Sequence, residues 1–323
     1  MATTEILLAL TGIHSRSERT IQATQDWERQ RIDSAALKRQ FQDDVKDLVE
    51  LQRSLSFYYF SDGQLTMAWQ DLLTPITRGA TGVRKGPLVR WFNTNTFYYA
   101  PLVEGPISAE GSRITGSVES KLLGQARSKV VLVDPLTFVE CSDNRFYRSR
   151  EELLFAYCDG LLSPTLHALQ ELGVRYVQFS APSLVARFRG ERWRADELSQ
   201  VAEGLRGALR GTSFRTGYHT FFGDASPYLS FLLDLVPADD VGFDLTETDP
   251  SSIPSTAKGI IAGVADARSS FIEQPLQLVA QLDGLPDKTG TLTLAPSSDL
   301  RYVPRIVADA KVKNLAKARS RLS

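Results

Sequence analysis

The segment KVVLVDP, residues 129–135, is a short unbroken run of aliphatic side chains that ends at an aspartate and a proline. Such a run is typical of a strand that is buried on both faces, as in a parallel sheet covered by helices. Similar β-rich runs recur at residues 5–12, 56–62, 88–92, 174–182, 213–224, 240–247, 258–266 and 289–296. Segments with apolar residues at helical spacing separate them, at residues 34–53, 151–172, 195–210 and 227–235. This alternation predicts an α/β fold with a parallel sheet.

The number of strand–helix units favours a closed barrel. About eight units within 323 residues fit a (β/α)8 TIM barrel better than a doubly wound sheet. The glycine pattern G-x-G-x-x-G of dinucleotide-binding sheets does not follow any predicted strand. We therefore predict a single TIM-barrel domain over residues 1–323. Residues 104–127 interrupt the alternation, and we expect them to form a rim insertion after the third strand, as a hairpin or a loop with a helix.

Composition excludes several classes of function. Lys and Arg total 37 against 38 for Asp and Glu, so the net charge of -1 gives no overall attraction for nucleic acid or an anionic membrane. No apolar run approaches the roughly 20 residues of a membrane-spanning helix. Cys141 and Cys158 lie outside any C-x-x-C motif, which argues against a disulfide framework or a cysteine-rich zinc site. We expect a cytoplasmic protein.

The stretch GPLVRWFNTNTFYYAPLVEG, residues 86–105, concentrates aromatic and asparagine side chains beside one turn. One interpretation is a buried strand whose aromatics belong to the core. The other places Trp91, Asn93, Asn95 and Tyr98 at the mouth of the barrel, facing a ligand. On the second interpretation, Trp91 and both asparagines stand at the C-terminal end of the third barrel strand.

Functional groups of (β/α)8 barrels lie at the C-terminal ends of the strands. Polar side chains follow several of the predicted strands here. Those that we expect to bind a ligand at the mouth are Arg16, Asp62, Gln64, Trp91, Asn93, Asn95, Tyr98, His219 and Asp244.

One family matches these motifs. The segment RWFNTNTFYYAP, residues 90–101, resembles the K-W-F-[ND]-T-N-Y-H-Y-x-x-P signature in the N-terminal barrel of cobalamin-independent methionine synthases. Further segments resemble motifs of the same barrel in the same order, from about residue 12 to residue 304: VVLVDPLTF (130–138), LGVRYVQFSAPSL (172–184), TFFGD (220–224), VGFDL (241–245), GVADAR (263–268) and APSSDLRYVP (295–304). The resemblance implies a TIM barrel and a role in methionine biosynthesis.

The catalytic barrel of that family holds a zinc ion with a histidine, two cysteines and a glutamate. The bound Zn²⁺ delivers the homocysteine thiol as a thiolate to the methyl donor. Here its H-x-C motif corresponds to His219, Thr220 and Phe221, and the later cysteine falls near Ser297 and Ser298. We therefore expect no metal or other cofactor in this chain, and zinc on a partner.

The substrate contacts of the family are also altered. Its Asp-Glu-Pro motif, which suits an ammonium group, reads Ser-Ala-Pro at residues 180–182. Its R-E-L-K motif near the start, which resembles a contact for the folate polyglutamate tail, reads Ser-Glu-Arg-Thr at residues 17–20, and a lysine of the same kind is replaced by Glu104. An acidic residue repels a polyanionic tail, so Glu18 and Arg16 remain as candidates for a smaller ligand.

Three functions fit these observations. The first is a partner subunit that docks onto a separate zinc-bearing catalytic barrel, and this is the one we favour. The second is an independent methyltransferase that uses a donor other than folate polyglutamate. A fold alone does not fix a function, so this hypothesis stays open. The third is a ligand sensor without catalysis, which the mouth without zinc ligands supports.

Overall fold

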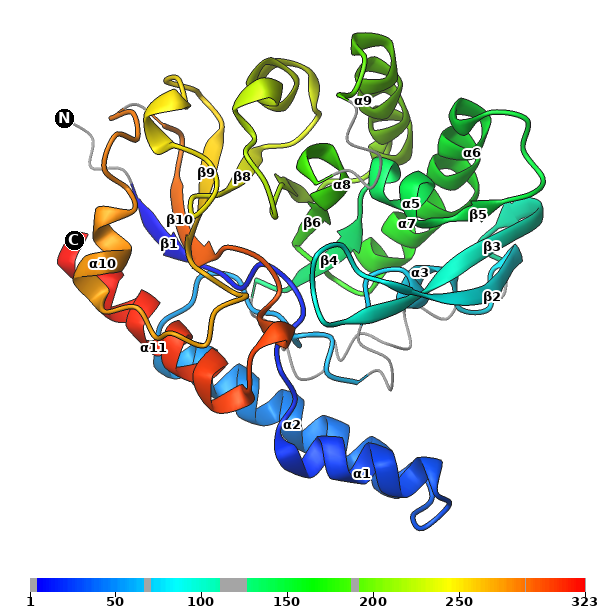
Figure 1. The fold of residues 1–323 in the computed structure, drawn as a ribbon, viewed down its shortest axis with the longest axis horizontal. Coiled ribbons are helices and arrows are strands. Elements are labelled where there is room, and N and C mark those ends of the chain that lie inside the picture. Colours follow the sequence, from blue (N-terminus) through cyan, green and yellow to red (C-terminus); the bar gives the residue numbers. More distant parts are fainter. Residues whose placement is uncertain (1–4, 67–70, 111–126, 187–191, 288, 323) are drawn as a thin grey trace.

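The computed structural model describes residues 5–66, 71–110, 127–186, 192–287 and 289–322. Its centre is a curled, seven-stranded parallel sheet (Figure 1). The strands, in spatial order, are β1 (Ile6–Leu8), β10 (Leu292–Pro296), β9 (Gly259–Ala265), β8 (Asp240–Asp244), β7 (Arg215–His219), β6 (Tyr176–Ser180) and β4 (Lys129–Val133). Each of these strands lies in a run that the sequence predicted, and the parallel α/β class is confirmed. Their residues are almost all buried, as unbroken apolar runs imply.

The predicted second strand, residues 56–62, lies between β1 and β4, the two edges of this sheet. Tyr58 N donates to Leu8 O at 3.0 Å on one side. On the other side Phe60 N donates to Arg127 O at 2.9 Å, and Lys129 N donates to Phe60 O at 2.7 Å. The segment forms an isolated parallel bridge rather than a regular strand.

Lys129 ties the same two edges together from inside the curl. It begins β4, yet its Nζ donates to Leu10 O just after β1 at 2.6 Å and to Gln178 Oε1 on β6 at 2.7 Å. Gln178 Nε2 in turn donates to Thr11 O. Lys129 is 1% exposed, and burial lowers its pKa to about 7. Polar side chains thus fill the middle of the curled sheet and connect strands that are distant in the sheet order.

The predicted third strand, residues 88–92, is wrong as a barrel strand. It belongs to an antiparallel hairpin of β2 (Thr81–Arg90) and β3 (Phe97–Ser108), beside which β5 (Asp143–Asn144) pairs parallel to β3. The connecting turn explains the difference, because Thr94 Oγ1 donates to Trp91 O at 2.6 Å and Trp91 N donates to Thr96 O at 2.9 Å. A tight local turn pairs the two apolar runs with each other instead of with the main sheet.

This hairpin also changes the expected rim insertion. The interruption of the βα alternation begins at β2, before the predicted start at residue 104, and β3 carries it to Ser108. Residues 111–126 of the predicted insertion lie outside the described residues.

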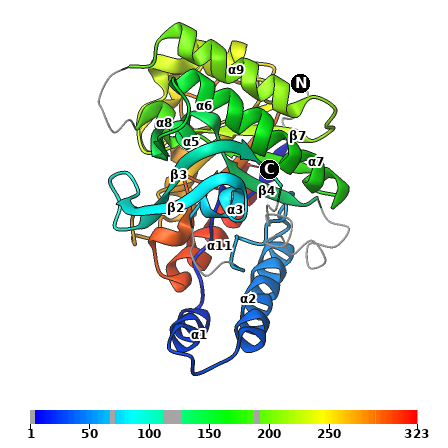
Figure 2. The ribbon, with the colours of Figure 1, turned by 90° about the vertical axis from the view of Figure 1, so that its right-hand side faces the viewer.

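Helices cover the outside of the curl (Figure 1). In chain order the described ones are α1 (Glu18–Glu28), α2 (Ser34–Ser54), α3 (Thr74–Thr77), α5 (Pro135–Cys141), α6 (Arg150–Tyr157), α7 (Ser163–Glu171), α8 (Pro182–Val185), α9 (Ala195–Leu209), α10 (Pro275–Ala280) and α11 (Arg305–Leu322). A π-helical turn, Cys158–Leu162, joins α6 to α7 within the predicted helix of residues 151–172. The pair α1 and α2 projects from the body (Figures 1 and 2). None of the helices in the described residues has the length and apolar character to cross a membrane.

The fold gives a direct test of the core interpretation of Trp91. This side chain is fully buried, with its ring centroid 5.4 Å from that of Tyr98 and 4.8 Å from that of Phe92. We expect Trp91→Ala to lower the free energy of unfolding by about 3–5 kcal/mol in urea titration, because it removes a large buried ring.

Phe97, on the outer side of the same hairpin, is the matched control because it is 51% exposed. Phe97→Ala should change the free energy of unfolding by less than about 1 kcal/mol. Equal losses in the two variants would contradict the assignment of Trp91 to the core.

Candidate functional site

The C-terminal ends of β7, β8 and β10 bring polar groups together at one end of the curled sheet. His219 ends β7, Asp244 ends β8, and Ser297 follows β10. His219 Nε2 lies 2.8 Å from Ser297 O, and because a carbonyl oxygen only accepts, Nε2 carries the proton and donates. The end of β7 is thereby fastened to the loop after β10.

His219 is a buried, neutral imidazole. Burial lowers its pKa to about 4, and the charge of Lys129 acts in the same direction. Its ring packs over Gly242 of β8, where a Cβ would lie 1.9 Å from Nδ1, so only glycine leaves room for it. Nδ1 makes no hydrogen bond to any of the described residues. His219 is thus held at the mouth by the hydrogen bond from Nε2 to Ser297 O.

The neighbourhood of His219 does not fit a zinc site of one histidine, two cysteines and a glutamate. Cys141 lies in α5 with its thiol hydrogen-bonded to Tyr98, and burial raises its pKa. Cys158 lies in the π-helical turn against Gly204 of α9. Among the residues that the structure describes, no group of three His, Cys, Asp or Glu side chains is placed to hold a metal ion.

Asp244 joins two loops of the mouth. Its Oδ1 accepts from Thr246 Oγ1 at 2.6 Å and from Thr246 N at 3.1 Å, while Phe222 N lies 3.4 Å from Oδ2. The carboxyl group is 1% exposed, and burial raises its pKa to about 6 against the opposing effect of these hydrogen bonds. A buried carboxyl group with a pKa near neutrality is a candidate for proton transfer at the mouth.

Aromatic rings connect the hairpin turn to this mouth. The rings of Phe92 and Phe222 lie 5.8 Å apart, and Phe222 is also 5.8 Å from Tyr302. Phe92 has φ 45° and Phe222 has φ 77°, the left-handed region that side chains other than glycine rarely adopt. Backbone strain of this kind persists where the surroundings fix it and is common at functional sites.

Sequence reasoning missed a buried charged network behind these rings. Asp299 Oδ1 accepts from Ile13 N at 3.0 Å, and its Oδ2 lies 3.5 Å from Arg301 Nε and accepts from Tyr302 OH at 3.3 Å. The Arg301 guanidinium in turn lies 5.5 Å from the ring centroid of Trp91. The charged residues Asp299 and Arg301 within APSSDLRYVP are the sequence signal for this network.

The remaining predicted residues divide between several places. Arg16 is 9% exposed, with its guanidinium 5.3 Å from the Phe41 ring, and burial lowers its pKa to about 10. Glu18 is exposed in the first turn of α1. Asp62 accepts from Gln64 N at 2.9 Å, and Gln64 Nε2 donates to Val131 O of β4 at 2.8 Å. Arg16 and Glu18 thus belong to the base of the projecting helices.

The predicted site residues of the hairpin do not lie at the end of a barrel strand, where the sequence places them. Trp91 and Tyr98 are buried, whereas Asn93 and Asn95 are exposed at the turn between β2 and β3. Asn95 Oδ1 accepts from the Arg90 guanidinium at 3.0 Å. The expected position of Trp91, Asn93 and Asn95 at the end of a barrel strand is therefore wrong, while the binding of a ligand by the predicted set stays a prediction.

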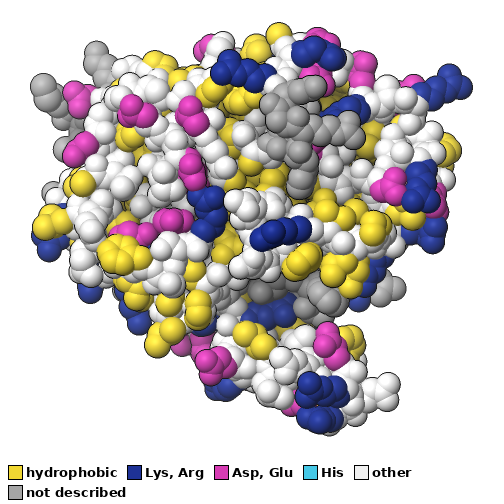
Figure 3. All heavy atoms as spheres, in the orientation of Figure 1, with side chains coloured by type: hydrophobic (Ala, Val, Ile, Leu, Met, Phe, Trp, Pro, Cys, Tyr) yellow, Lys and Arg dark blue, Asp and Glu magenta, His cyan; other side chains and the backbone are white. Residues whose placement is uncertain are grey.

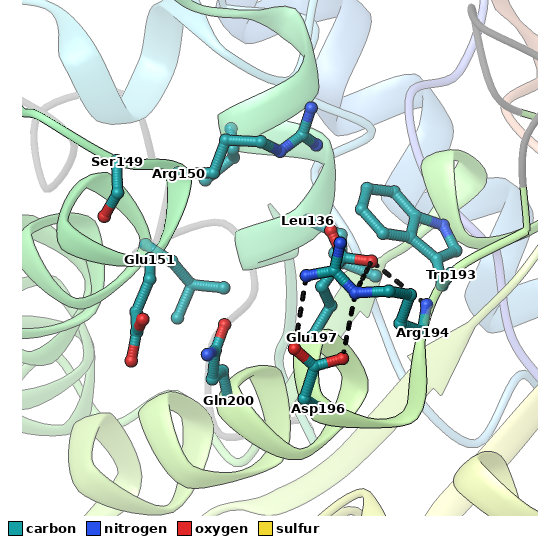
Figure 4. A pocket seen from close by; sticks show the side chains of 11 residues that line it. Leu136, Ser149, Arg150, Glu151, Trp193, Arg194, Asp196, Glu197 and Gln200 are labelled. Carbon is teal, nitrogen blue, oxygen red and sulfur yellow. Dashed lines mark hydrogen bonds and ion pairs between the residues drawn. The ribbon is translucent and has the colours of Figure 1, made fainter.

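A hollow of about 290 Å³ lies among α5, α6 and α9 (Figure 4). Its rim carries two cationic side chains, but both face carboxylates. Arg194 Nε lies 3.1 Å from Asp196 Oδ1, as Figure 4 shows, and Arg150 is paired with Glu140. Because these charges are already neutralised, the hollow is a weak candidate for an anionic ligand.

Residues 43–289 match the sequence model of a family described as the cobalamin-independent synthase N-terminal domain. The chain belongs to this family. The family assignment made from the sequence motifs is thereby confirmed.

Curated relatives carry the corresponding names. The 5-methyltetrahydropteroyltriglutamate–homocysteine methyltransferase of Mycobacterium leprae is 26% identical over 247 residues, which are 72% of this chain and 31% of the relative. That of Streptococcus suis is 28% identical over 251 residues, or 72% of this chain and 32% of the relative. The methionine synthase of Sulfolobus acidocaldarius is 22% identical over 228 residues, or 68% and 65% of the two chains. This chain thus spans about a third of the length of the first two relatives.

Two solved structures share the fold over their full length. The B12-independent methionine synthase of Shewanella sp. W3-18-1, in complex with selenomethionine, has a TM-score of 0.75 at 17% identity and covers 98% of this chain and 97% of its own. The putative vitamin-B12-independent methionine synthase of Listeria monocytogenes has a TM-score of 0.75 at 13% identity, with coverages of 100% and 99%. At these identities the likeness concerns the fold.

The mouth geometry predicts an unusual titration of Asp244. Its pKa of about 6 exceeds the ordinary value of 3.8, so the folded state holds the proton more tightly than the unfolded state. The stability contributed by this group is fully present below about pH 4 and is lost as the pH rises through about 6. Carboxyl ¹³C NMR, with Asp244→Asn for assignment, should show a midpoint near pH 6, and a midpoint near 4 would contradict the buried position.

The same geometry predicts the metal content. We expect the purified chain to hold no stoichiometric zinc, because His219 is bound to a backbone carbonyl and has no thiol beside it in the sequence motif. Elemental analysis after exposure to zinc and desalting is the measurement. One tightly held zinc per chain, lost in His219→Ala, would show that the mouth rearranges into a metal site.

Proposed function

We propose that this chain is a subunit of a cobalamin-independent methionine synthase, and that it acts with a separate, zinc-bearing catalytic barrel in methyl transfer to homocysteine. Membership of the N-terminal-domain family supports the first part. The observation that carries the second part is the hydrogen bond from His219 to Ser297 O, at the position where the catalytic barrel has a zinc ligand.

The chemistry explains why a partner is required. An ordinary thiol with a pKa near 8.5 is only a few per cent ionised at pH 7, so homocysteine needs a group that generates its thiolate. The neutral His219 carries its proton on Nε2, and its basic atom Nδ1 is buried over Gly242. Burial lowers the pKa of the ring to about 4, so it is a weak base towards a thiol. The serines that follow β10 supply hydroxyl groups, which are poor zinc ligands beside thiolates.

Glu104, which replaces the tail-binding lysine of the family, does not favour a folate polyglutamate tail. Glu104 lies on β3, where its Oε2 accepts from Arg84 Nε at 2.7 Å, and Arg145 NH1 lies 3.9 Å from its Oε1. This carboxylate therefore neutralises cations of the hairpin region. A methyl-folate with a polyglutamate tail is accordingly a poorer substrate for this chain alone than a donor with a smaller anionic group.

Two further parts of the proposal concern the closure of the barrel and the cellular compartment. We infer that residues 56–62 act as the eighth strand of a closed (β/α)8 barrel, since they hydrogen-bond to both edges of the seven-stranded sheet. We place the complex in the cytoplasm, where the free thiols of Cys141 and Cys158 stay reduced.

The second candidate function is an independent methyltransferase. It is favoured by the Shewanella structure, which carries the name of a methionine synthase and has nearly the same length as this chain. On this alternative, Asp244 and the rings of Phe92 and Phe222 face a small donor at the mouth. The two candidates differ in whether turnover needs a second protein.

The deciding experiment measures methionine formation from homocysteine and methyl-folate. We expect the chain alone, loaded with zinc, to give no turnover above the rate without protein. We expect turnover when a candidate catalytic chain with an H-x-C motif and a later cysteine is added.

The control is His219→Ala, which removes the hydrogen bond to Ser297 O. Turnover by the wild-type chain alone that is abolished in this variant would refute the partner-subunit proposal in favour of the independent enzyme. A homocysteine analogue without the thiol should give no product in either arrangement.

A further inference from the structure

The hairpin presents one apolar face to solvent. Arg90 lies opposite Phe97 and Leu88 lies opposite Tyr99, so these four side chains share a face. Leu88 is 52% exposed and Phe97 is 51% exposed, which is high for large apolar side chains. The other face carries Val89 and the buried Tyr98 towards the helices. Figure 2 shows β2 and β3 on the outside of the molecule.

The hairpin also has a free edge. In the part of the chain that the structure describes, β2 pairs with β3 and with no other strand, so its ten residues form an edge strand. Pro87 has no N–H, and the pairing of β2 with β3 shifts register between Lys85 and Leu88, so the backbone groups that can pair with a strand of another chain lie on either side of this point. The edge lies next to the exposed Leu88 and Phe97, which would cover the side chains of an added strand.

The charges of the hairpin indicate which kind of strand can pair with it. Residues 81–108 contain three cationic side chains, Arg84, Lys85 and Arg90, against one carboxylate, Glu104, in a chain whose net charge is -1. Figure 3 shows hydrophobic side chains beside Lys and Arg over the part of the surface where Figure 1 places β2 and β3. Arg84 is paired with Glu104, so the positive charge of the hairpin comes from Lys85 and Arg90, and it favours an acidic partner.

A second copy of this chain fits this edge poorly. Two-fold antiparallel pairing of β2 with itself would place Arg84 and Lys85 of one copy near the cations of the other. Like charges opposite each other destabilise a strand pair. The occupant is therefore a different protein.

We propose that the free edge of β2, with the exposed face of Leu88 and Phe97, docks an acidic extended segment of the zinc-bearing catalytic chain. This rests on the proposed partner-subunit function. The position of the hairpin supports it, because the turn that ends β2 contacts the mouth through the rings of Phe92 and Phe222, which lie 5.8 Å apart. A chain paired to β2 is thereby held beside the mouth.

The test measures binding of the labelled candidate catalytic chain to the full-length protein by fluorescence anisotropy. Two variants probe the surface: Leu88→Ala with Phe97→Ala, and Lys85→Glu, which reverses the charge of an exposed side chain on β2. We expect each to weaken binding on the order of ten-fold, and the wild-type complex to weaken with added salt.

Matched controls lie on other surfaces. Phe271→Ala removes an apolar side chain that is 58% exposed, and Arg19→Glu reverses a charge on α1 whose side chain is 72% exposed. Both should bind as the wild type does, and circular dichroism should show all variants folded.

The outcomes separate the docking surface from the function. Tight binding that the hairpin variants leave unchanged overturns the docking surface, even if methionine is formed. Hairpin-dependent binding without methionine formation supports the surface and refutes the function. Absence of binding by the wild-type chain, or a preference of the hairpin for RNA or for a second copy, overturns the docking proposal.

Discussion

The interior of the curled sheet depends on one buried ammonium group. Lys129 on β4 donates to a carbonyl just after β1 and to the amide of Gln178, and it therefore holds together the two edge strands of the seven-stranded sheet. Its hydrogen-bond partners are neutral oxygens, and the Tyr176 ring, whose centroid lies 5.2 Å from Nζ, and the charge of Asp240 also favour the ammonium form. The bridging segment around Phe60 lies over the same gap. Without these contacts the parallel sheet would have two open edges and a polar interior exposed to water.

The positions of the side chains at the mouth depend on the closure of the sheet by Lys129 and the segment around Phe60. Because the strand ends are fixed relative to one another, His219 can reach across to Ser297 O, and Asp299 can hold Ile13 N in the loop after β1. The hydrogen bond to Ser297 O engages Nε2 of His219, and its Nδ1 faces Gly242. The same end of the molecule contacts the hairpin through aromatic rings, so the exposed strand edge and the mouth form one continuous structural unit.

The sequence predicts elements correctly where burial produces a recognisable local pattern of apolar residues. Strands buried on both faces, such as β4 and β9, appear as unbroken apolar runs, and they were found within a few residues. The run at residues 88–92 has the same appearance, but the Asn-Thr-Asn-Thr turn pairs it with residues 97–108. The sequence interpretation assigns the asparagines of this turn to ligand binding instead of to a tight turn. Local pattern alone does not distinguish a strand of the main sheet from a hairpin strand with one covered face.

The candidate site was less predictable because side-chain direction depends on tertiary packing. His219 and Asp244 were placed at the correct strand ends, but Arg16, two residues beyond His14, turns away towards Phe41 and the acidic Asp44. The charged pair Asp299 and Arg301 gave no periodic signal, since Arg301 lies in a 3-10 helix of only three residues, Leu300–Tyr302, and Asp299 precedes it. Such residues are identified by the side chains that surround them in the folded protein, and the sequence alone does not show these neighbours.

The lysine at the centre of the closure couples folding to the solvent. With a pKa of about 7 in the folded chain against 10.5 when it is free, Lys129 carries less positive charge after folding than before. Near pH 8, formation of the sheet therefore expels most of one proton into the buffer. The heat of folding then contains the ionisation enthalpy of whichever buffer takes up that proton. Calorimetric enthalpies of this protein would differ between phosphate and Tris for a reason that lies in a single side chain inside the sheet.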